Sequence, residues 1–214
     1  ISSGTLAVTC WERVEVVAAP VDWRAVGAIV RRVHGIDGAA LPERYPLVAP
    51  SDLPWWDFDR LLADCGDRLD PLARAGIDAA IGRHAGWQSW ERSQPTVVCH
   101  GDVHPGNILM TRAGPLLLDW DLMSRAPAGW DHGPLLTWTD RWGGAPGLYE
   151  QFVEGYGLDL RDDPMASGYA ELRLVAATLM RVIAANREPA AGPEAERRLA
   201  YWRGDPDAPA WAAQ

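Results

Sequence analysis

The polar stretch HGDVHPGN (100–107) constrains the fold of this chain more than any other part of the sequence. It lies between the apolar runs TVV (96–98) and ILM (108–110), and such runs predict a short strand on either side of a polar loop. The two glycines and the proline of the stretch favour a compact turn. A compact turn brings Asp102 and Asn107 together. Their side chains can accept a proton from a hydroxyl group and bind a hard cation through oxygen.

A third oxygen-bearing side chain follows on the next predicted strand. The apolar run PLLLDW (115–120) ends near Asp119, and TRAG (111–114) predicts the turn of a hairpin between this strand and NILM (107–110). We expect the hairpin to bring Asp119 close to Asn107. A sparse set of oxygen ligands suits Mg²⁺, which keeps several waters and shares the phosphates of a nucleotide.

The rest of the chain is mostly helical by the spacing of its apolar residues, and strands and helices do not alternate as in a doubly wound sheet. The expected fold is therefore α+β and mostly α, with a helical body that carries a small β-hairpin and its loop. A cap at Asp22 and a stop at Gly35 bound the first predicted helix. Further helices are expected over 57–68, 71–92, 130–142, 145–156, 165–186 and 193–203, strands over 4–17, 95–100, 107–110 and 115–120, and an irregular segment over 41–56.

Charge and composition exclude several classes of partner. The net charge of −9 disfavours a nucleic-acid partner, because phosphates attract basic surfaces. It is weakly compatible with a cationic small substrate, although an acidic surface that only keeps the protein in solution is the simpler explanation. No apolar run approaches the length that spans a bilayer, and no basic-then-apolar leader opens the chain, so we expect a cytoplasmic protein without a membrane partner. Three distant cysteines argue against a disulfide framework.

The motif HGDVHPGN followed by LLLDWD resembles the aminoglycoside phosphotransferase and choline kinase family, which is related to the protein kinases. The resemblance implies that Asp102 is the catalytic residue that orients and deprotonates the acceptor hydroxyl. It also implies that Asn107 and Asp119 hold Mg²⁺ beside ATP or another nucleoside triphosphate. We therefore expect a small-molecule kinase that transfers the γ-phosphate of ATP to a hydroxyl of a small acceptor, for which the acidity weakly favours a cation.

The resemblance assigns supporting roles to His100 and Asp131, and local sequence position suggests roles for His34, His104 and Asp121. His100 is expected to pack and hydrogen-bond within the loop, and Asp131 in GWDHGPLL (129–136) is expected to brace it. His34 ends an apolar helical stripe and is expected to make a structural hydrogen bond. His104 is expected to face solvent or to cap the loop, and Asp121 fits a metal-supporting role and a surface position equally well.

By this resemblance the chain has two parts. Residues 1–16 correspond to the last strand of the small lobe and the hinge, where the Glu12 carbonyl and the Val14 amide would face adenine. Residues 17–214 correspond to the large C-terminal lobe of a kinase-like fold. The glycine-rich loop over the phosphates has no counterpart, and all 20 basic side chains are Arg, so the phosphate-binding Lys is missing too. We expect the chain alone to be weakly active and its sequence to start within a longer coding sequence.

Two other readings of the motif stay open. His100, Asp102, His104 and Asp119 could bind Zn²⁺ or a two-metal centre in a metal-dependent hydrolase. The chain could also be an inactive kinase-like fragment or a binding module, which the missing Lys favours. Within the kinase reading, aminoglycosides, choline-like alcohols, homoserine, other amino sugars and macrolides are all candidate acceptors, and the oligomeric state is left open.

Overall fold

The computed structural model of the chain describes residues 12–42 and 47–212 and consists mostly of helices. The helices are α1 (Trp23–His34), α2 (Phe58–Cys65), α3 (Pro71–Arg83), α4 (Trp90–Ser93), α5 (Gly129–Leu136), α6 (Trp138–Trp142), α7 (Leu148–Tyr156), α8 (Pro164–Arg187) and α9 (Gly192–Trp202). The strands are β1 (Val97–Cys99), β2 (Ile108–Thr111), β3 (Gly114–Leu117) and β4 (Ser124–Ala126). The expected α+β, mostly α fold with a small β-hairpin is confirmed.

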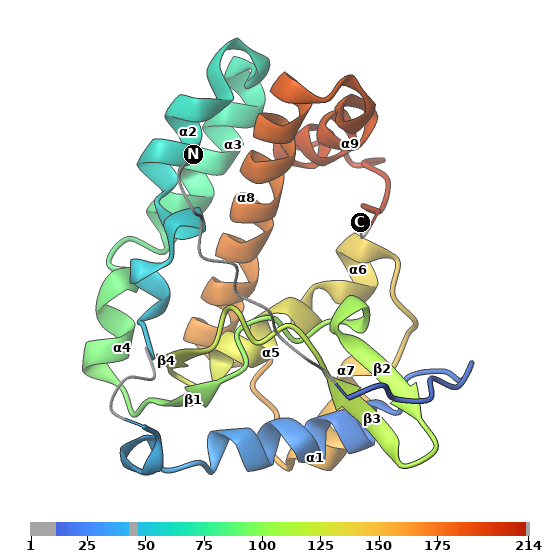
Figure 1. Ribbon diagram of the computed structural model, residues 1–214. Coiled ribbons are helices and arrows are strands. Elements are labelled where there is room, and N and C mark those ends of the chain that lie inside the picture. Colours follow the sequence, from blue (N-terminus) through green and yellow to red (C-terminus); the bar gives the residue numbers. More distant parts are fainter. Residues whose placement is uncertain (1–11, 43–46, 213–214) are drawn as a thin grey trace, which may run out of the picture.

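The long helix α8 runs through the middle of the molecule and joins its two halves (Figure 1). At one end α8 packs against α2, α3 and α9, and at the other end it packs against α5. Helices α1 and α7 pack together beside the strands (Figure 1). Asp163 begins α8 as its N-cap, because its side chain accepts hydrogen bonds from the Met165 and Ala166 amides at 2.8 Å.

Two small antiparallel sheets hold the polar loop between them. In one, β2 pairs with β3 so that Ile108 faces Leu117. In the other, β1 pairs with β4 and Val98 faces Arg125, although no strand was predicted at β4. The loop 100–107 therefore leaves one sheet at β1 and enters the other at β2.

The predicted strand over 115–120 is too long. Strand β3 ends at Leu117, and Asp119 has φ 60°, which takes it out of extended geometry. Of the predicted strand over 4–17, residues 4–11 lie outside the described residues. Its last part lies against the hairpin, where Val16 pairs with Thr111 and the Val17 amide donates to the Met110 carbonyl at 2.8 Å.

Several predicted helices are shorter than expected. Helix α1 follows its Asp22 cap as predicted, but the segments expected over 57–68 and 71–92 both break. The first ends at its C-cap Gly66 (φ 56°), in a backbone conformation that is open to glycine. The second ends at Arg83, and Gly86 (φ 85°) separates α3 from the turn that leads into α4. The segment expected over 130–142 divides into α5 and α6.

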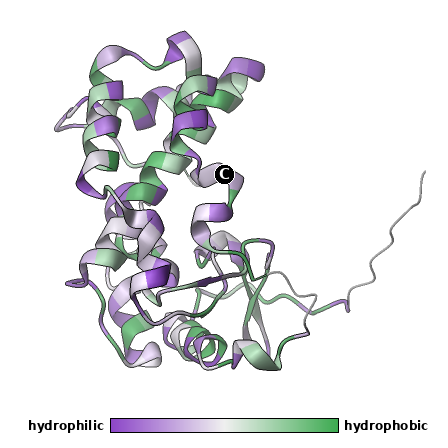
Figure 2. Ribbon diagram, turned by 90° about the vertical axis from the view of Figure 1, so that its left-hand side faces the viewer, coloured by the Kyte–Doolittle hydropathy of each residue, from purple (hydrophilic) through white to green (hydrophobic). Residues whose placement is uncertain are grey.

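The core consists of two clusters of buried side chains. The larger lies among α2, α3, α8 and α9 and contains a group of packed aromatic rings, in which Trp56 lies 4.6 Å from Trp130 between centroids. The smaller lies between α1, α7 and the hairpin. Figure 2 shows polar and apolar residues mixed along the same helices, as expected where each helix buries one face. Within residues 12–42 and 47–212, every helix is too short or too polar to cross a membrane.

Replacing Gly27 by Ala should destabilise the packing of α1 on α7. A Cβ at Gly27 would lie 2.0 Å from the Phe152 carbonyl oxygen, so the two backbones would have to separate. We expect Gly27→Ala to lower the free energy of unfolding by at least about 1–3 kcal/mol in urea titrations followed by tryptophan fluorescence. Gly82→Ala is the matched control, because nothing lies within 4 Å of its added Cβ. Its free energy of unfolding should rise by up to about 1 kcal/mol. Equal losses in both variants would contradict the close contact.

Candidate active site

The compact loop 100–107 brings Asp102 and Asn107 together. The Asn107 Nδ2 atom donates to Oδ2 of Asp102 and to the Asp102 carbonyl oxygen, each at 3.0 Å. Pro105 and Gly106 begin the turn that holds Asn107 in place. The two side chains that the sequence singled out therefore form one unit at the start of β2.

Asp131 of α5 holds the backbone of this loop. Its carboxylate is fully buried and accepts hydrogen bonds from the His100 amide at 2.8 Å and the Gly101 amide at 2.7 Å. His34 of α1 contributes a third contact at 3.0 Å through Nε2. Burial raises the pKa of Asp131, but hydrogen bonding and charge from His34 and the Gly101 amide outweigh it, so the pKa lies below its ordinary value. The structure confirms the bracing role of Asp131 and the structural hydrogen bond of His34.

Both ring nitrogens of His100 are used inside the loop. Nδ1 accepts from the Asp102 amide at 3.2 Å, so Nε2 carries the proton and donates to the Leu118 carbonyl at 2.8 Å. The ring is fully buried, as expected for a packing role. No nitrogen of His100 is left for a metal ion, which counts against the hydrolase alternative.

His104 lies beside the Asp102 carboxylate rather than in solvent. Its Nδ1 accepts from the Gly106 amide at 3.1 Å, and its Nε2 lies 3.3 Å from Asp102 Oδ2. The ring stacks on Trp138 of α6 with centroids 5.3 Å apart. The capping role that the sequence favoured is thus observed, together with a contact to Asp102 that it did not predict.

Arg173 of α8 is the site residue that sequence reasoning missed. Its Nη1 donates to Asp102 Oδ1 at 2.8 Å, its Nη2 donates to the Gly101 carbonyl, and its guanidinium lies 4.9 Å from the centre of the Trp130 ring. Arg173 lies 71 residues beyond Asp102, so no local motif points to it. The only sequence signal is an Arg on an otherwise apolar stretch of helix.

These contacts keep Asp102 ionised. Burial raises its pKa, but the His104 hydrogen bond and the charge of Arg173 lower it more, so the pKa lies well below its ordinary value. A carboxylate that stays charged at neutral pH can orient a hydroxyl group and accept its proton.

Three predicted site residues are exposed: Asp119, Glu12 and Val14. The Leu118 amide donates to the Asn107 carbonyl at 2.9 Å, which places Asp119 one residue beyond the backbone partner of Asn107. Glu12 and Val14 precede Val16 on the segment that lies against the hairpin. The metal role of Asp119 and the adenine-facing roles of Glu12 and Val14 stay predictions.

The donor set near Asn107 fits Mg²⁺. Because Nδ2 of Asn107 is the atom bonded to Asp102, its side-chain oxygen is the atom left for a cation, and Asp119 adds a second hard oxygen ligand nearby in the chain. Among the described residues, the one group of three or more His, Cys, Asp or Glu ligand atoms that lie close together is His34, Cys99 and Asp131, within 4.8 Å of one another. His34 and Asp131 of that group are already hydrogen-bonded to each other, so we treat the group as part of the brace.

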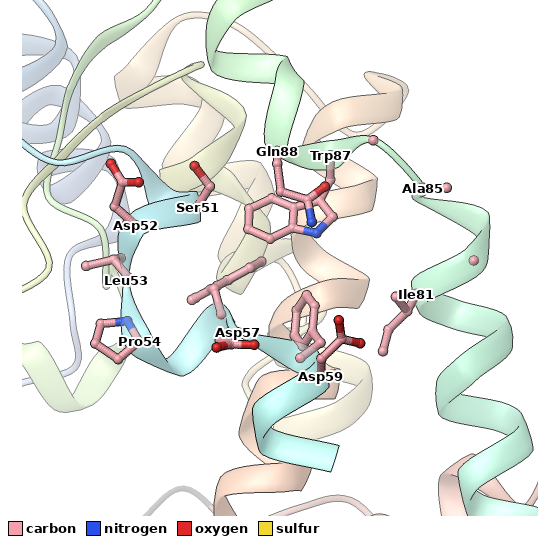
Figure 3. A pocket seen from close by; sticks show the side chains of 14 residues that line it. Ser51, Asp52, Leu53, Pro54, Asp57, Asp59, Ile81, Ala85, Trp87 and Gln88 are labelled. Carbon is pink, nitrogen blue, oxygen red and sulfur yellow. The ribbon is translucent and has the colours of Figure 1, made fainter. Parts of the chain in front are cut away.

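A cavity of about 470 Å³ is lined by residues within 51–59 and 81–88, without Asp102 (Figure 3). Figure 3 shows Asp57 and Asp59 across the cavity from Trp87. Its lining includes Trp56, which packs on Trp130, and Trp130 in turn lies under Arg173. We do not assign this cavity to the site at Asp102.

Comparison with known proteins identifies the family. Residues 7–175 match the family model described as the phosphotransferase enzyme family. The chain belongs to this family. A search of curated protein sequences finds no match.

Solved structures with a similar fold include kinases and phosphotransferases that act on small molecules. A choline/ethanolamine kinase family protein from Mesorhizobium loti is 21% identical, with a TM-score of 0.59, covering 85% of this chain and 60% of that one. Choline kinase LicA from Streptococcus pneumoniae is 16% identical, with a TM-score of 0.57 and coverages of 86% and 63%. A spectinomycin phosphotransferase in complex with AMP is 20% identical, with a TM-score of 0.53 and coverages of 87% and 66%. This phosphotransferase-family chain thus has a kinase-like fold and spans 60–66% of the length of these structures.

Replacing Asp131 by Asn should loosen the loop. An asparagine offers one acceptor oxygen, and its NH₂ group faces amides that also donate, so at least one loop amide loses its partner. We expect a loss of about 1–3 kcal/mol in the free energy of unfolding for each amide left without an acceptor, with faster hydrogen exchange at His100 and Gly101. Asp163→Asn is the matched control, because Asn caps a helix about as well as Asp. Unchanged exchange at both loop amides in Asp131→Asn would contradict the brace.

Stability should fall as the pH drops from about 6.5 towards 4, partly because of His132. Burial and then the charge of His34 lower the pKa of this ring from 6.5 to about 4 in the folded protein. Between these two pKa values the ring is protonated in the unfolded chain but not in the folded chain. The free energy of unfolding should therefore fall by about 1.4 kcal/mol for each pH unit. Urea titrations at several pH values measure this slope. In His132→Gln the slope should be shallower, and an unaltered slope would show that His132 does not cause it.

Proposed function

We propose that this chain forms the large lobe of a kinase that transfers the γ-phosphate of ATP to a hydroxyl group of a small acceptor molecule. The observation that carries the proposal is the Asp102 carboxylate, which stays ionised and contacts Asn107, His104 and Arg173 in a braced loop. Membership of the phosphotransferase enzyme family supports this proposal. Residues 17–214 would form the large lobe, and residues 1–16 the last strand of the small lobe and the hinge.

Each site residue then has a distinct role. Asp102 orients the acceptor hydroxyl and accepts its proton. Asn107 and Asp119 hold Mg²⁺, which when bound neutralises charge on the transferred phosphate. The Glu12 carbonyl and the Val14 amide face the adenine. Structures of a spectinomycin phosphotransferase with AMP and with ADP support the use of an adenine nucleotide.

The acceptor is a small molecule, and its identity is the open part of the proposal. The similar structures include choline kinases, a macrolide phosphotransferase and a spectinomycin phosphotransferase. Choline, macrolides and spectinomycin all carry an alcohol group, but they differ widely in size, ring structure and charge. A nucleoside triphosphate donor would place the reaction in the cytoplasm.

Transfer from ATP should require Asp102. We expect Asp102→Asn to lower kcat about 10²–10⁴-fold, the usual contribution of a positioned base, while Mg-ATP affinity measured by calorimetry changes little. Asp119→Asn should instead weaken Mg-ATP binding. The acceptor panel comprises choline, homoserine, amino sugars and a macrolide, and the exposed Asp67→Asn serves as the control.

Because the chain spans 60–66% of the length of similar structures, the assay uses this chain and any longer form that the upstream coding DNA encodes. If no form binds Mg-ATP and none transfers phosphate, the kinase proposal is wrong and the binding-module reading stands.

A further inference from the structure

The two oxygens of the Asp102 carboxylate have unequal surroundings. Oδ2 accepts from Asn107 Nδ2 at 3.0 Å and contacts His104 Nε2 at 3.3 Å. Among the residues that the structure describes, Oδ1 accepts only from Arg173 Nη1, at 2.8 Å. Because each carboxylate oxygen offers about two lone-pair sites, Oδ2 is filled and Oδ1 has one direction left.

Arg173 holds Oδ1 and the loop backbone at the same time. While Nη1 donates to the carboxylate, Nη2 donates to the Gly101 carbonyl, so the planar guanidinium spans both groups. The guanidinium also lies over the Trp130 ring, 4.9 Å from its centre. The Gly101 amide is in turn held by Asp131. The orientation of the carboxylate is therefore set from α8 as well as from the loop itself.

We propose that Arg173 is a positioning residue for phosphoryl transfer, which turns Asp102 so that Oδ1 faces the acceptor hydroxyl and takes its proton. This inference rests on the proposed function of Asp102. In the step it serves, the acceptor oxygen bonds to the γ-phosphorus while its proton passes to Oδ1. The bond from that phosphorus to the β–γ bridging oxygen breaks, and ADP leaves with the electron pair.

The paired donors of the Arg173 guanidinium, Nη1 to Asp102 and Nη2 to Gly101, form a fork that distinguishes a positioning role from simple packing. A Met side chain could fill the space over Trp130 but could not hold Oδ1 or the Gly101 carbonyl. A Lys could supply the positive charge but not two parallel donors in one plane. Arg173→Met therefore removes charge and orientation, whereas Arg173→Lys removes mainly orientation. Arg83→Met is the control, because Arg83 of α3 pairs with Glu171, which lies on α8 like Arg173. Among the described residues Arg83 makes no hydrogen bond to the loop.

The first test does not depend on activity. Carbon-13 NMR follows the titration of the Asp102 carboxyl in the full chain, with its signal assigned by Asp102→Asn. In Arg173→Met the midpoint should rise by about one pH unit or more, the effect of a neighbouring guanidinium. It should stay low in Arg173→Lys and in the Arg83→Met control. A folded Arg173→Met protein with an unchanged midpoint would overturn the proposal.

The second test uses the transfer reaction in whichever form of the protein is active. We expect kcat to fall about 10–100-fold in Arg173→Met and nearly as far in Arg173→Lys, with the KM for ATP unchanged, because misplacement of a reacting group costs rate rather than nucleotide binding. Full kcat in Arg173→Lys would show that orientation by the fork is not needed, and would overturn the proposal even if Arg173→Met fails to fold. If no form transfers phosphate but the titration shifts as expected, the contact of Arg173 with Asp102 is supported. In that case only the proposed kinase function, and with it the positioning role, is wrong.

Discussion

The buried carboxylate of Asp131 is the interaction on which the rest of the site depends. It receives two loop amides and the His34 ring in a place where water cannot replace them. Leaving one of those buried amides without an acceptor would lower the free energy of unfolding by about 1–3 kcal/mol, and leaving the buried carboxylate without donors would lower it more. The tight bend after β1 is therefore stable only when α1, α5 and the loop are assembled together. The geometry of the site thus depends on the packing of the helical body.

Polar contacts extend from this brace to Asp102 without a break. Gly101 gives its amide to Asp131 and its carbonyl to Arg173, and Arg173 then reaches the Asp102 carboxylate. Every link joins segments that are far apart in sequence, so the position of the carboxylate reflects the packing of α5 and α8. Hydrogen bonds that tie one loop to two packed helices restrict its motion, and a reaction that depends on positioning requires such restriction.

Sequence patterns predicted the parts of this site that are local. The interval between Asp102 and Asn107 is a property of one turn, and the Asp22 cap belongs to one helix, so both could be read along the chain. The resemblance to a known family added Asp131. Arg173 could not be found, because a single Arg on an apolar helix face has many conceivable partners and only the packing of α8 selects one. Strand β4 was missed for the same reason: three residues become a strand only because β1 lies beside them.

Local charge at the loop differs from the charge of the whole chain. The net charge of −9 suggests a field that attracts cations, yet the carboxylate at the centre of the site is matched by a guanidinium at 2.8 Å. This pairing holds the Asp102 carboxylate ionised, and the charge of Arg173 is already engaged without a nucleotide. Phosphoryl transfer still requires positively charged groups next to the phosphates, to neutralise their negative charge. Arg173 is already paired with Asp102 and the chain has no Lys, so under the proposed function a metal ion held by the free oxygen of Asn107 and by Asp119 would supply part of that charge.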